Sequence, residues 1–248
     1  MSINLKIWRQ VGPDTPGGLQ DYRMEGLDKN MSFLECLDLL NEDLIKKGEA
    51  AIEFDSDCRE GICGTCGLNI QGVAHGPKAA VTTCEIRMRH FPDGGTVIVE
   101  PFRAAPLPVI KDLVVDRSSL ERIMEAGGYV STNVGSAPDS NAVPIPKQHA
   151  DKAMDAASCI GCGACIAACP NASASLFLSA KVSQLSYLPQ GHPERGKRAL
   201  AMIAQMDKEG FGACSNHGEC EAVCPKEVSI ENIARMRREY FKGALSGA

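Results

Sequence analysis

The chain has 248 residues, a net charge of −5 and a pI near 5.6. This acidic balance argues against a nucleic-acid-binding protein, which normally carries a basic surface. Its twelve cysteines would suggest disulfides in a small secreted protein. The N-terminus resembles neither a signal peptide nor a transit peptide, and its intact initiator Met favours a bacterial chain. We therefore expect metal-bound thiolates in a reducing compartment.

No apolar run approaches the ~18 residues of a membrane span, so any membrane association is expected to come through a partner. The first hundred residues predict strands around a single helix. A capping box from Ser32 to Glu35 begins that helix, and Cys36 is interpreted as a small core residue. The apolar residues of its buried face are Phe33, Leu37, Leu40 and Leu44. Strands are predicted at residues 4–8, 19–24, 51–54, 68–70 and 97–100.

A cysteine-rich loop follows the third predicted strand. Its C-x4-C-x2-C spacing, with a fourth cysteine further on, is the plant-type [2Fe–2S] pattern. The predicted ligands are Cys58, Cys63, Cys66 and Cys84. Gly61 and Gly64 allow backbone N–H groups to approach the sulfurs. A helix between strands, followed by a cysteine loop, is typical of a β-grasp domain. His75 lies between the last two cysteines and is expected to be solvated rather than a ligand.

A proline-rich segment at residues 101–108 is the predicted linker. It divides the chain into a [2Fe–2S] ferredoxin-type domain at 1–105 and a helical domain at 106–248. The fold class is therefore α+β, with an N-terminal β-grasp domain and a C-terminal all-α, bacterial-ferredoxin-like domain. In the second part, a capping box from Ser118 to Glu121 is expected to begin a helix. Residues 127–149 are predicted to form a long irregular loop of the kind that is functional or docked on a partner.

Two cysteine runs in the C-terminal part carry the pattern of the bacterial ferredoxins. The first, at residues 159–170, has the spacing C-x2-C-x2-C-x3-C-P, in which the fourth cysteine ligates the other cluster of a two-cluster protein. The second, at residues 214–225, has His217 in place of its second cysteine. Interleaving the runs predicts a [4Fe–4S] cluster on Cys159, Cys162, Cys165 and Cys224. The remaining ligands are Cys169, Cys214 and Cys220. Their site has one thiolate fewer than a [4Fe–4S] cluster needs, which predicts a [3Fe–4S] cluster.

Two alternatives stay open for these runs. His217 could ligate a fourth iron, as histidine does in Rieske centres. Structural zinc is disfavoured, because zinc sites use paired C-x2-4-C knuckles rather than four cysteines in eleven residues. Three different clusters without a nucleophile, an acid–base dyad or a dinucleotide loop indicate electron transfer, so no catalytic residue is predicted. Either one component of a redox enzyme or a freestanding multi-cluster ferredoxin fits this description.

Several features together resemble one known family. They are Cys-Arg-Glu-Gly-Ile-Cys-Gly-Thr-Cys-Gly at residues 58–67, Val-Glu-Pro at 99–101, and the interleaved runs that end in Cys-Pro-Lys at 224–226. Over nearly its whole length the chain resembles the iron–sulfur subunit of succinate dehydrogenase/fumarate reductase. The resemblance implies a peripheral subunit, clamped between a flavoprotein and a membrane anchor, on the cytoplasmic face of the bacterial inner membrane.

By this resemblance, FAD on the flavoprotein oxidises succinate in the tricarboxylic acid cycle. Electrons then pass through [2Fe–2S], [4Fe–4S] and [3Fe–4S] to a quinone of the respiratory chain. The reverse direction is that of a quinol:fumarate reductase. The chain also resembles the branch with a longer [2Fe–2S] loop, which tends to occur with a haem- or cluster-bearing anchor.

Two positions depart from the family pattern. Many members carry tryptophans shortly after the first Cys-Pro, where this chain has residues 171–174, and many carry His where it has Ser215. These departures favour a quinone site formed mostly by the anchor. Pro170 and His217 are the candidate quinone contacts from this chain.

Overall fold

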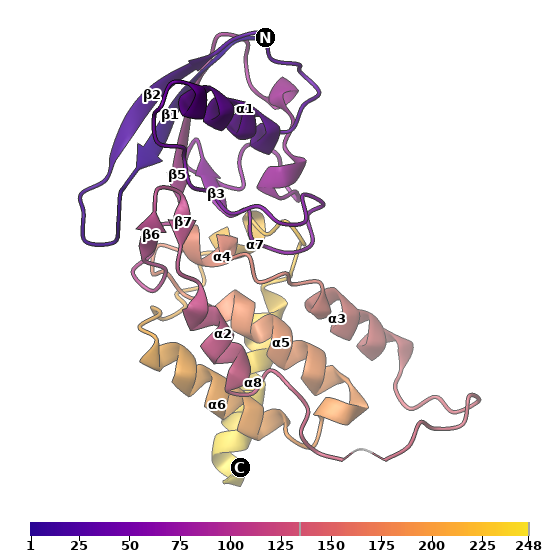
Figure 1. The fold of residues 1–248 in the computed structure, drawn as a ribbon. Coiled ribbons are helices and arrows are strands. Elements are labelled where there is room, and N and C mark those ends of the chain that lie inside the picture. Colours follow the sequence, from indigo (N-terminus) through magenta and orange to yellow (C-terminus); the bar gives the residue numbers. More distant parts are fainter. Residues whose placement is uncertain (134, 248) are drawn as a thin grey trace.

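The computed structural model describes residues 1–133 and 135–247 (Figure 1). A sheet and one helix form the N-terminal part, and most of the C-terminal part is helical. This confirms the α+β class. Among the described residues, no helix is both long and apolar enough to cross a membrane.

The N-terminal sheet has the strand order β2-β1-β5-β3-β4, in which β1 is antiparallel to β2 and parallel to β5. Its strands are β1 (Ile3–Arg9), β2 (Gly18–Met24), β3 (Leu68–Ile70), β4 (Val73–Ala74) and β5 (Thr96–Pro101). Alternate residues of β1 are fully buried, which is the period-two pattern of a sheet with one face in the core. The strands β1, β2, β3 and β5 confirm four of the five strands predicted from the sequence.

The helix α1 (Phe33–Lys46) begins as predicted. The Ser32 side chain accepts a hydrogen bond from Glu35 N, and the Glu35 side chain accepts one from Ser32 N, so both halves of the capping box are present. The predicted apolar stripe is buried, and Cys36 lies in the same core.

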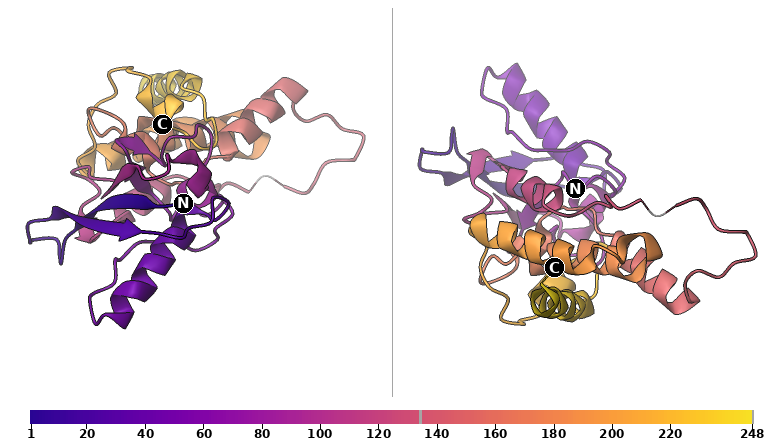
Figure 2. Two further views of the ribbon diagram at one scale, coloured as in Figure 1. Left: turned by 90° about the horizontal axis from the view of Figure 1, so that it is seen from above. Right: turned by 90° about the horizontal axis from the view of Figure 1, so that it is seen from below.

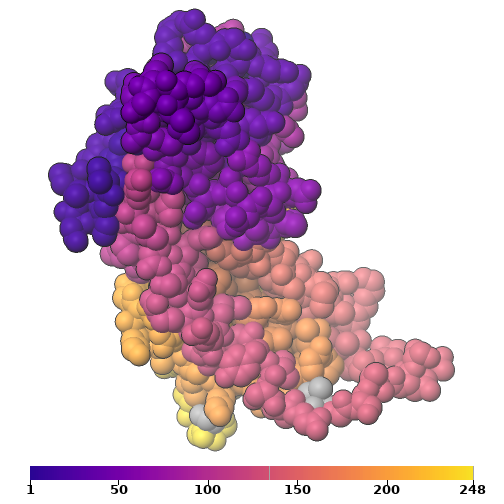
Figure 3. All heavy atoms as spheres, in the orientation of Figure 1, coloured from indigo at the N-terminus to yellow at the C-terminus, as the bar shows by residue number. Residues whose placement is uncertain are grey.

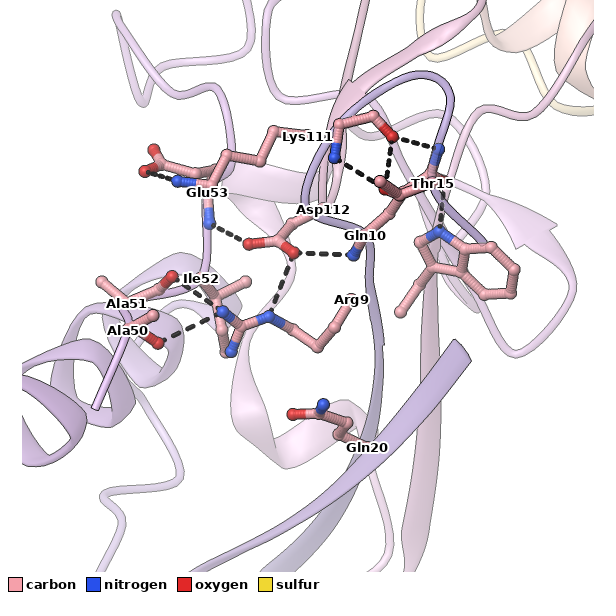
Figure 4. A network of polar contacts seen from close by, with 12 residues as sticks. Arg9, Gln10, Thr15, Gln20, Ala50, Ala51, Ile52, Glu53, Lys111 and Asp112 are labelled. Carbon is pink, nitrogen blue, oxygen red and sulfur yellow. Dashed lines mark hydrogen bonds and ion pairs between the residues drawn. The ribbon is translucent and has the colours of Figure 1, made fainter. Parts of the chain in front are cut away.

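The strand predicted at residues 51–54 is wrong, because its backbone bonds mainly to side chains and, apart from one bond from Leu113 N to Glu53 O, makes no ladder with a neighbouring segment. Ile52 N donates to Asn41 Oδ1 at 2.7 Å, and Asn41 Nδ2 donates to Ile52 O at 2.9 Å. Glu53 N donates to Asp112 Oδ2 at 3.1 Å (Figure 4). The apolar alternation therefore correctly indicated that Ile52 is buried, but the segment does not pair as a strand.

The C-terminal part begins with a hairpin of β6 (Val109–Lys111) and β7 (Val114–Val115), which the sequence prediction missed. Its longer helices are α2 (Ser118–Glu125), α3 (Lys147–Ala157), α5 (Ser175–Tyr187), α6 (Arg195–Lys208) and α8 (Glu231–Ser246). The short helices are α4 (Ala164–Ala167) and α7 (Glu219–Ala222), with 3-10 turns at Thr83–Glu85, Met88–His90 and Pro189–Gly191.

Two predictions for this part need correction. The capping box at Ser118 is absent, because Ser118 is already inside the helix and its N–H donates to Asp116 Oδ1 at 2.8 Å. The irregular loop ends earlier than predicted, since α3 begins at Lys147. In Figure 2, residues 135–146 project away from the helices.

The two parts pack directly against each other (Figures 1 and 3). Each has its own apolar core, and a smaller third cluster joins them. That cluster contains Ala74 and Phe102 from the N-terminal side, with Cys162 and Ala164 from the first ferredoxin run. A cysteine of one predicted cluster site is therefore part of the contact between the two parts.

Candidate functional site

The loop at residues 55–67 brings three cysteines of the plant-type pattern together, and a 3-10 turn supplies the fourth, Cys84. Glu60 N and Ile62 N lie 3.3 Å and 3.5 Å from Cys58 Sγ. Thr65 N lies 3.5 Å from Cys63 Sγ. Backbone N–H groups that point at sulfur stabilise a thiolate, which is the form that binds iron.

The thiols of this loop also interact with one another. A hydrogen bond between Cys66 and Cys84 lowers the pKa of Cys84 to about 6 and raises that of Cys66. At Cys63, burial acts in the opposite direction, but hydrogen bonds from Thr65 and Cys58 lower the pKa to about 7. The arrangement therefore places thiolate character on two of the four sulfurs near neutral pH.

Cysteines from both ferredoxin runs line a second site. Cys159, Cys162 and Cys165 share one pocket with Cys224, which lies 59 residues beyond Cys165 in the sequence. The chain curls at Gly161 (φ +65°) and Gly163 (φ +87°), a left-handed conformation that suits glycine. Burial raises the pKa of Cys162 to about 12 and that of Cys165 well above its ordinary value.

A third pocket is lined by Cys169, Cys214 and Cys220. Two contacts hold the loop that carries Cys214 beside the first run. Asn171 Nδ2 donates to Ala213 O at 2.9 Å and to Ser215 Oγ at 2.6 Å. A Cβ on Gly212 would lie 1.9 Å from Asn171 O, so only glycine fits there. Asn171, the first of residues 171–174, is thus bonded to Ser215, so the two places where the sequence departs from the family pattern are in contact.

The candidate quinone contacts lie near this third pocket. His217 is exposed and lines the pocket, whereas Pro170 is exposed but outside its lining. Their contact with a quinone stays a prediction.

The donors in these three places suit iron–sulfur clusters. All twelve cysteines are free thiols. Soft thiolates with amide N–H groups around them are the ligand set of such clusters, and the positive charge of bound iron would deprotonate thiols that burial alone keeps neutral. Among the described residues, no three His, Cys, Asp or Glu side chains converge closely enough to hold a single metal ion.

The prediction that His75 is solvated is wrong. Its side chain is 1% exposed, its Nδ1 lies 3.0 Å from Thr83 Oγ1, and its ring stands edge-on to Phe102 at 5.5 Å. Burial lowers its pKa to about 4, so the ring is neutral at pH 7. In the structure His75 directly follows the strand pair β3–β4, whose buried face includes Ala74.

Comparison with known proteins identifies both halves of the chain. Residues 4–122 match the family described as "2Fe-2S iron-sulfur cluster binding domain", and residues 155–228 match "4Fe-4S dicluster domain". The chain is 29% identical over 205 residues to the fumarate reductase iron–sulfur subunit of Escherichia coli, with 81% of this chain and 77% of that one covered. It is 28% identical over 209 residues to the succinate dehydrogenase iron–sulfur subunit of Bacillus subtilis, with 78% and 74% covered.

The chain belongs to the iron–sulfur subunits of the succinate dehydrogenase/fumarate reductase family. It is also 30% identical over 239 residues to one of the chains of the fumarate reductase (CoM/CoB) of Methanothermobacter marburgensis, covering 94% of this chain but only 42% of that protein. The fold of this iron–sulfur subunit is similar to a chain of the Mycobacterium smegmatis Sdh1 complex. The TM-score is 0.65 at 19% identity, covering 97% of this chain and 96% of that one.

Proposed function

We propose that this chain is the electron-transfer subunit of a membrane-bound succinate dehydrogenase. The observation that carries the proposal is the pocket in which Cys224 joins Cys159, Cys162 and Cys165, while Cys169 joins Cys214 and Cys220 in the next. This exchange of cysteines between runs is how two adjacent ferredoxin clusters share their ligands. By this proposal, two redox sites lie side by side within the helical part of the chain.

The proposed ligand sets follow these groups. Cys58, Cys63, Cys66 and Cys84 hold [2Fe–2S]; Cys159, Cys162, Cys165 and Cys224 hold [4Fe–4S]; Cys169, Cys214 and Cys220 hold [3Fe–4S]. When bound, each cluster accepts and passes on single electrons. The chain itself binds the clusters, limits water around the buried cysteines and sets the spacing between sites. We further propose that residues 1–105 form a β-grasp [2Fe–2S] domain and 106–248 a bacterial-ferredoxin-like helical domain.

The partners are proposed from the resemblance of the chain to its family. A flavoprotein subunit carrying FAD would deliver electrons from succinate to the [2Fe–2S] loop, where Ile62 is 62% exposed and Cys58 is partly exposed. A membrane anchor would bind quinone near the third pocket. The chain would then lie peripherally on the cytoplasmic face of a bacterial inner membrane.

The alternative function is the same relay in reverse, as a quinol:fumarate reductase, and relatives of both names support it. The physiological direction depends on cluster potentials, which their surroundings tune over roughly −700 to +450 mV.

Low-temperature EPR on membranes that contain the tagged chain and its natural partners tests the proposal. We expect a three-iron signal in the oxidised sample that disappears when succinate is added. A three-iron signal that is indifferent to succinate would contradict the partner assignment. A tagged chain that purifies alone from a soluble extract, with all its clusters, would instead favour a freestanding ferredoxin.

A further inference from the structure

The loop that carries the proposed [2Fe–2S] ligands meets the loop that carries the proposed [4Fe–4S] ligands at Gly64. Gly64 is buried and lies directly after Cys63, with φ +75°. A Cβ at this position would lie 2.3 Å from Ile160 O and 3.1 Å from Cys162 N. Both are backbone atoms, so a side chain at position 64 cannot be accommodated by a rotamer change. Any larger residue must push the two loops apart.

An arginine from a third segment holds this contact together. Arg117 lies between the β6–β7 hairpin and α2, and its Nη1 donates a hydrogen bond to Gly64 O. The positive charge of the same guanidinium also favours the thiolate form of Cys162. Arg117 is partly buried, which strengthens a charge-assisted hydrogen bond relative to one in water.

Apolar packing beside this bond closes the contact to solvent. Phe102 is 1% exposed and packs so closely on Gly67 that a Cβ there would lie 2.6 Å from its ring. Phe102 also shares the interface cluster with Cys162 and Ala164. The loops therefore meet through a fixed, desolvated contact.

We propose that Gly64 and Arg117 are positioning residues for electron transfer between the [2Fe–2S] and [4Fe–4S] sites, with Cys63–Gly64 against Cys162 as the route. The inference rests on the proposed function. With both clusters bound, one electron would pass from the reduced [2Fe–2S] centre held by the Cys63 loop to the [4Fe–4S] centre held by the Cys162 loop, with no bond broken and no proton moved. Electron tunnelling falls steeply with distance, so the rate depends on how closely these backbones approach.

The test compares Gly64→Ala with Gly72→Ala in the complete complex. Gly72 has the same left-handed backbone (φ +79°) but nothing within 4 Å of the Cβ position, so it controls for backbone strain alone. Iron content and the EPR signal of each cluster are measured first. The readouts are the magnetic coupling between the two reduced centres and the rate at which the second is reduced after the first.

We expect Gly64→Ala to weaken the coupling and slow the transfer several-fold, with all clusters assembled, whereas Gly72→Ala changes neither. Equal coupling and equal rate in the two variants would overturn the inference. Loss of all clusters from the unmodified chain would instead count against the proposed function.

A second pair of variants covers the case in which Gly64→Ala does not assemble. Arg117→Met removes the charge and the donor at similar length, and Arg117→Lys keeps both. We expect Arg117→Met to slow the transfer several-fold and to speed hydrogen exchange of the Cys162 amide, with Arg117→Lys restoring most of both. An Arg117→Met chain with normal coupling, rate and exchange would overturn the inference.

Discussion

Arg9 and Asp112 form an ion pair across 103 residues of sequence, with 3.1 Å between Arg9 Nε and Asp112 Oδ1 (Figure 4). The side chain of Asp112 is only 3% exposed, and it also accepts hydrogen bonds from Gln10 N and Glu53 N. Asp112 is in the turn of the β6–β7 hairpin. One carboxylate therefore joins β1, the segment after α1 and the hairpin that follows the linker.

Asp112→Ala is expected to loosen this junction. It leaves a largely buried guanidinium and two backbone N–H groups without their acceptor, which costs about 2–4 kcal/mol. Hydrogen exchange of the Asp112 and Leu113 amides, which bond to Gln10 O and Glu53 O, measures the local opening free energy. Lys6→Ala is the control, because its pair with Asp21 is exposed and contributes less than about 1 kcal/mol. Equal protection in the two variants would contradict this account.

His75 is expected to make stability depend on pH. Its folded pKa of about 4 lies below the ordinary 6.5, so the unfolded chain binds more protons between these values. The contribution is complete above pH 6.5 and is lost as the pH falls towards 4, by about 3 kcal/mol. His75→Asn keeps an acceptor for Thr83 N but does not titrate. Thermal midpoints of the two proteins should diverge below pH 6.5, with the unmodified chain falling faster; parallel curves would refute the prediction.

Because the two runs exchange cysteines, a substitution in one run is expected to remove the cluster bound mainly by the other. Cys224→Ala should abolish the [4Fe–4S] signal although it alters the second run, because Cys224 lines the pocket of the first. Cys169→Ala should abolish the [3Fe–4S] signal although it alters the first run. EPR of both variants decides, with a retained [2Fe–2S] signal as the internal control. Loss of the [3Fe–4S] signal in Cys224→Ala and of the [4Fe–4S] signal in Cys169→Ala would show instead that each run binds its own cluster.

Cys36 is expected to bind no iron. It is fully buried in α1, and burial raises its pKa to about 12, which keeps it an unreactive thiol at neutral pH. Cys36→Ala should leave the iron content unchanged and cost roughly 1 kcal/mol of packing. Metal analysis of the variant tests this, since a loss of iron would make Cys36 a ligand. Alkylation of the native protein should leave the buried Cys36 thiol unmodified.

His217→Ala separates the two accounts of the incomplete third site. His217 is exposed at the rim of that pocket, so we expect the variant to keep the three-iron signal and its iron content. A histidine that ligated a fourth iron would not be dispensable in this way, and its removal would change both the iron count and the EPR spectrum.

The sequence by itself determined the local features. The spacing of the cysteines, the glycines between them and the capping box at Ser32 depend on a few consecutive residues, and the structure shows their local geometry as expected for the cap and the curled loops. The alternating apolar residues of β1 and the stripe of α1 were predictable for the same reason.

Only the tertiary structure decided which distant groups meet. Residues 51–54 carry a strand pattern, yet their backbone bonds to Asn41 and Asp112, which the local sequence does not contain. The polar side chain of His75 is buried because Thr83 binds one nitrogen and Phe102 covers the ring. The approach of Gly64 to Cys162 depends on the packing of two separate parts of the chain. Apart from the bond between His75 and Thr83, these contacts join segments that are at least eleven residues apart, where spacing and periodicity carry no information about distance.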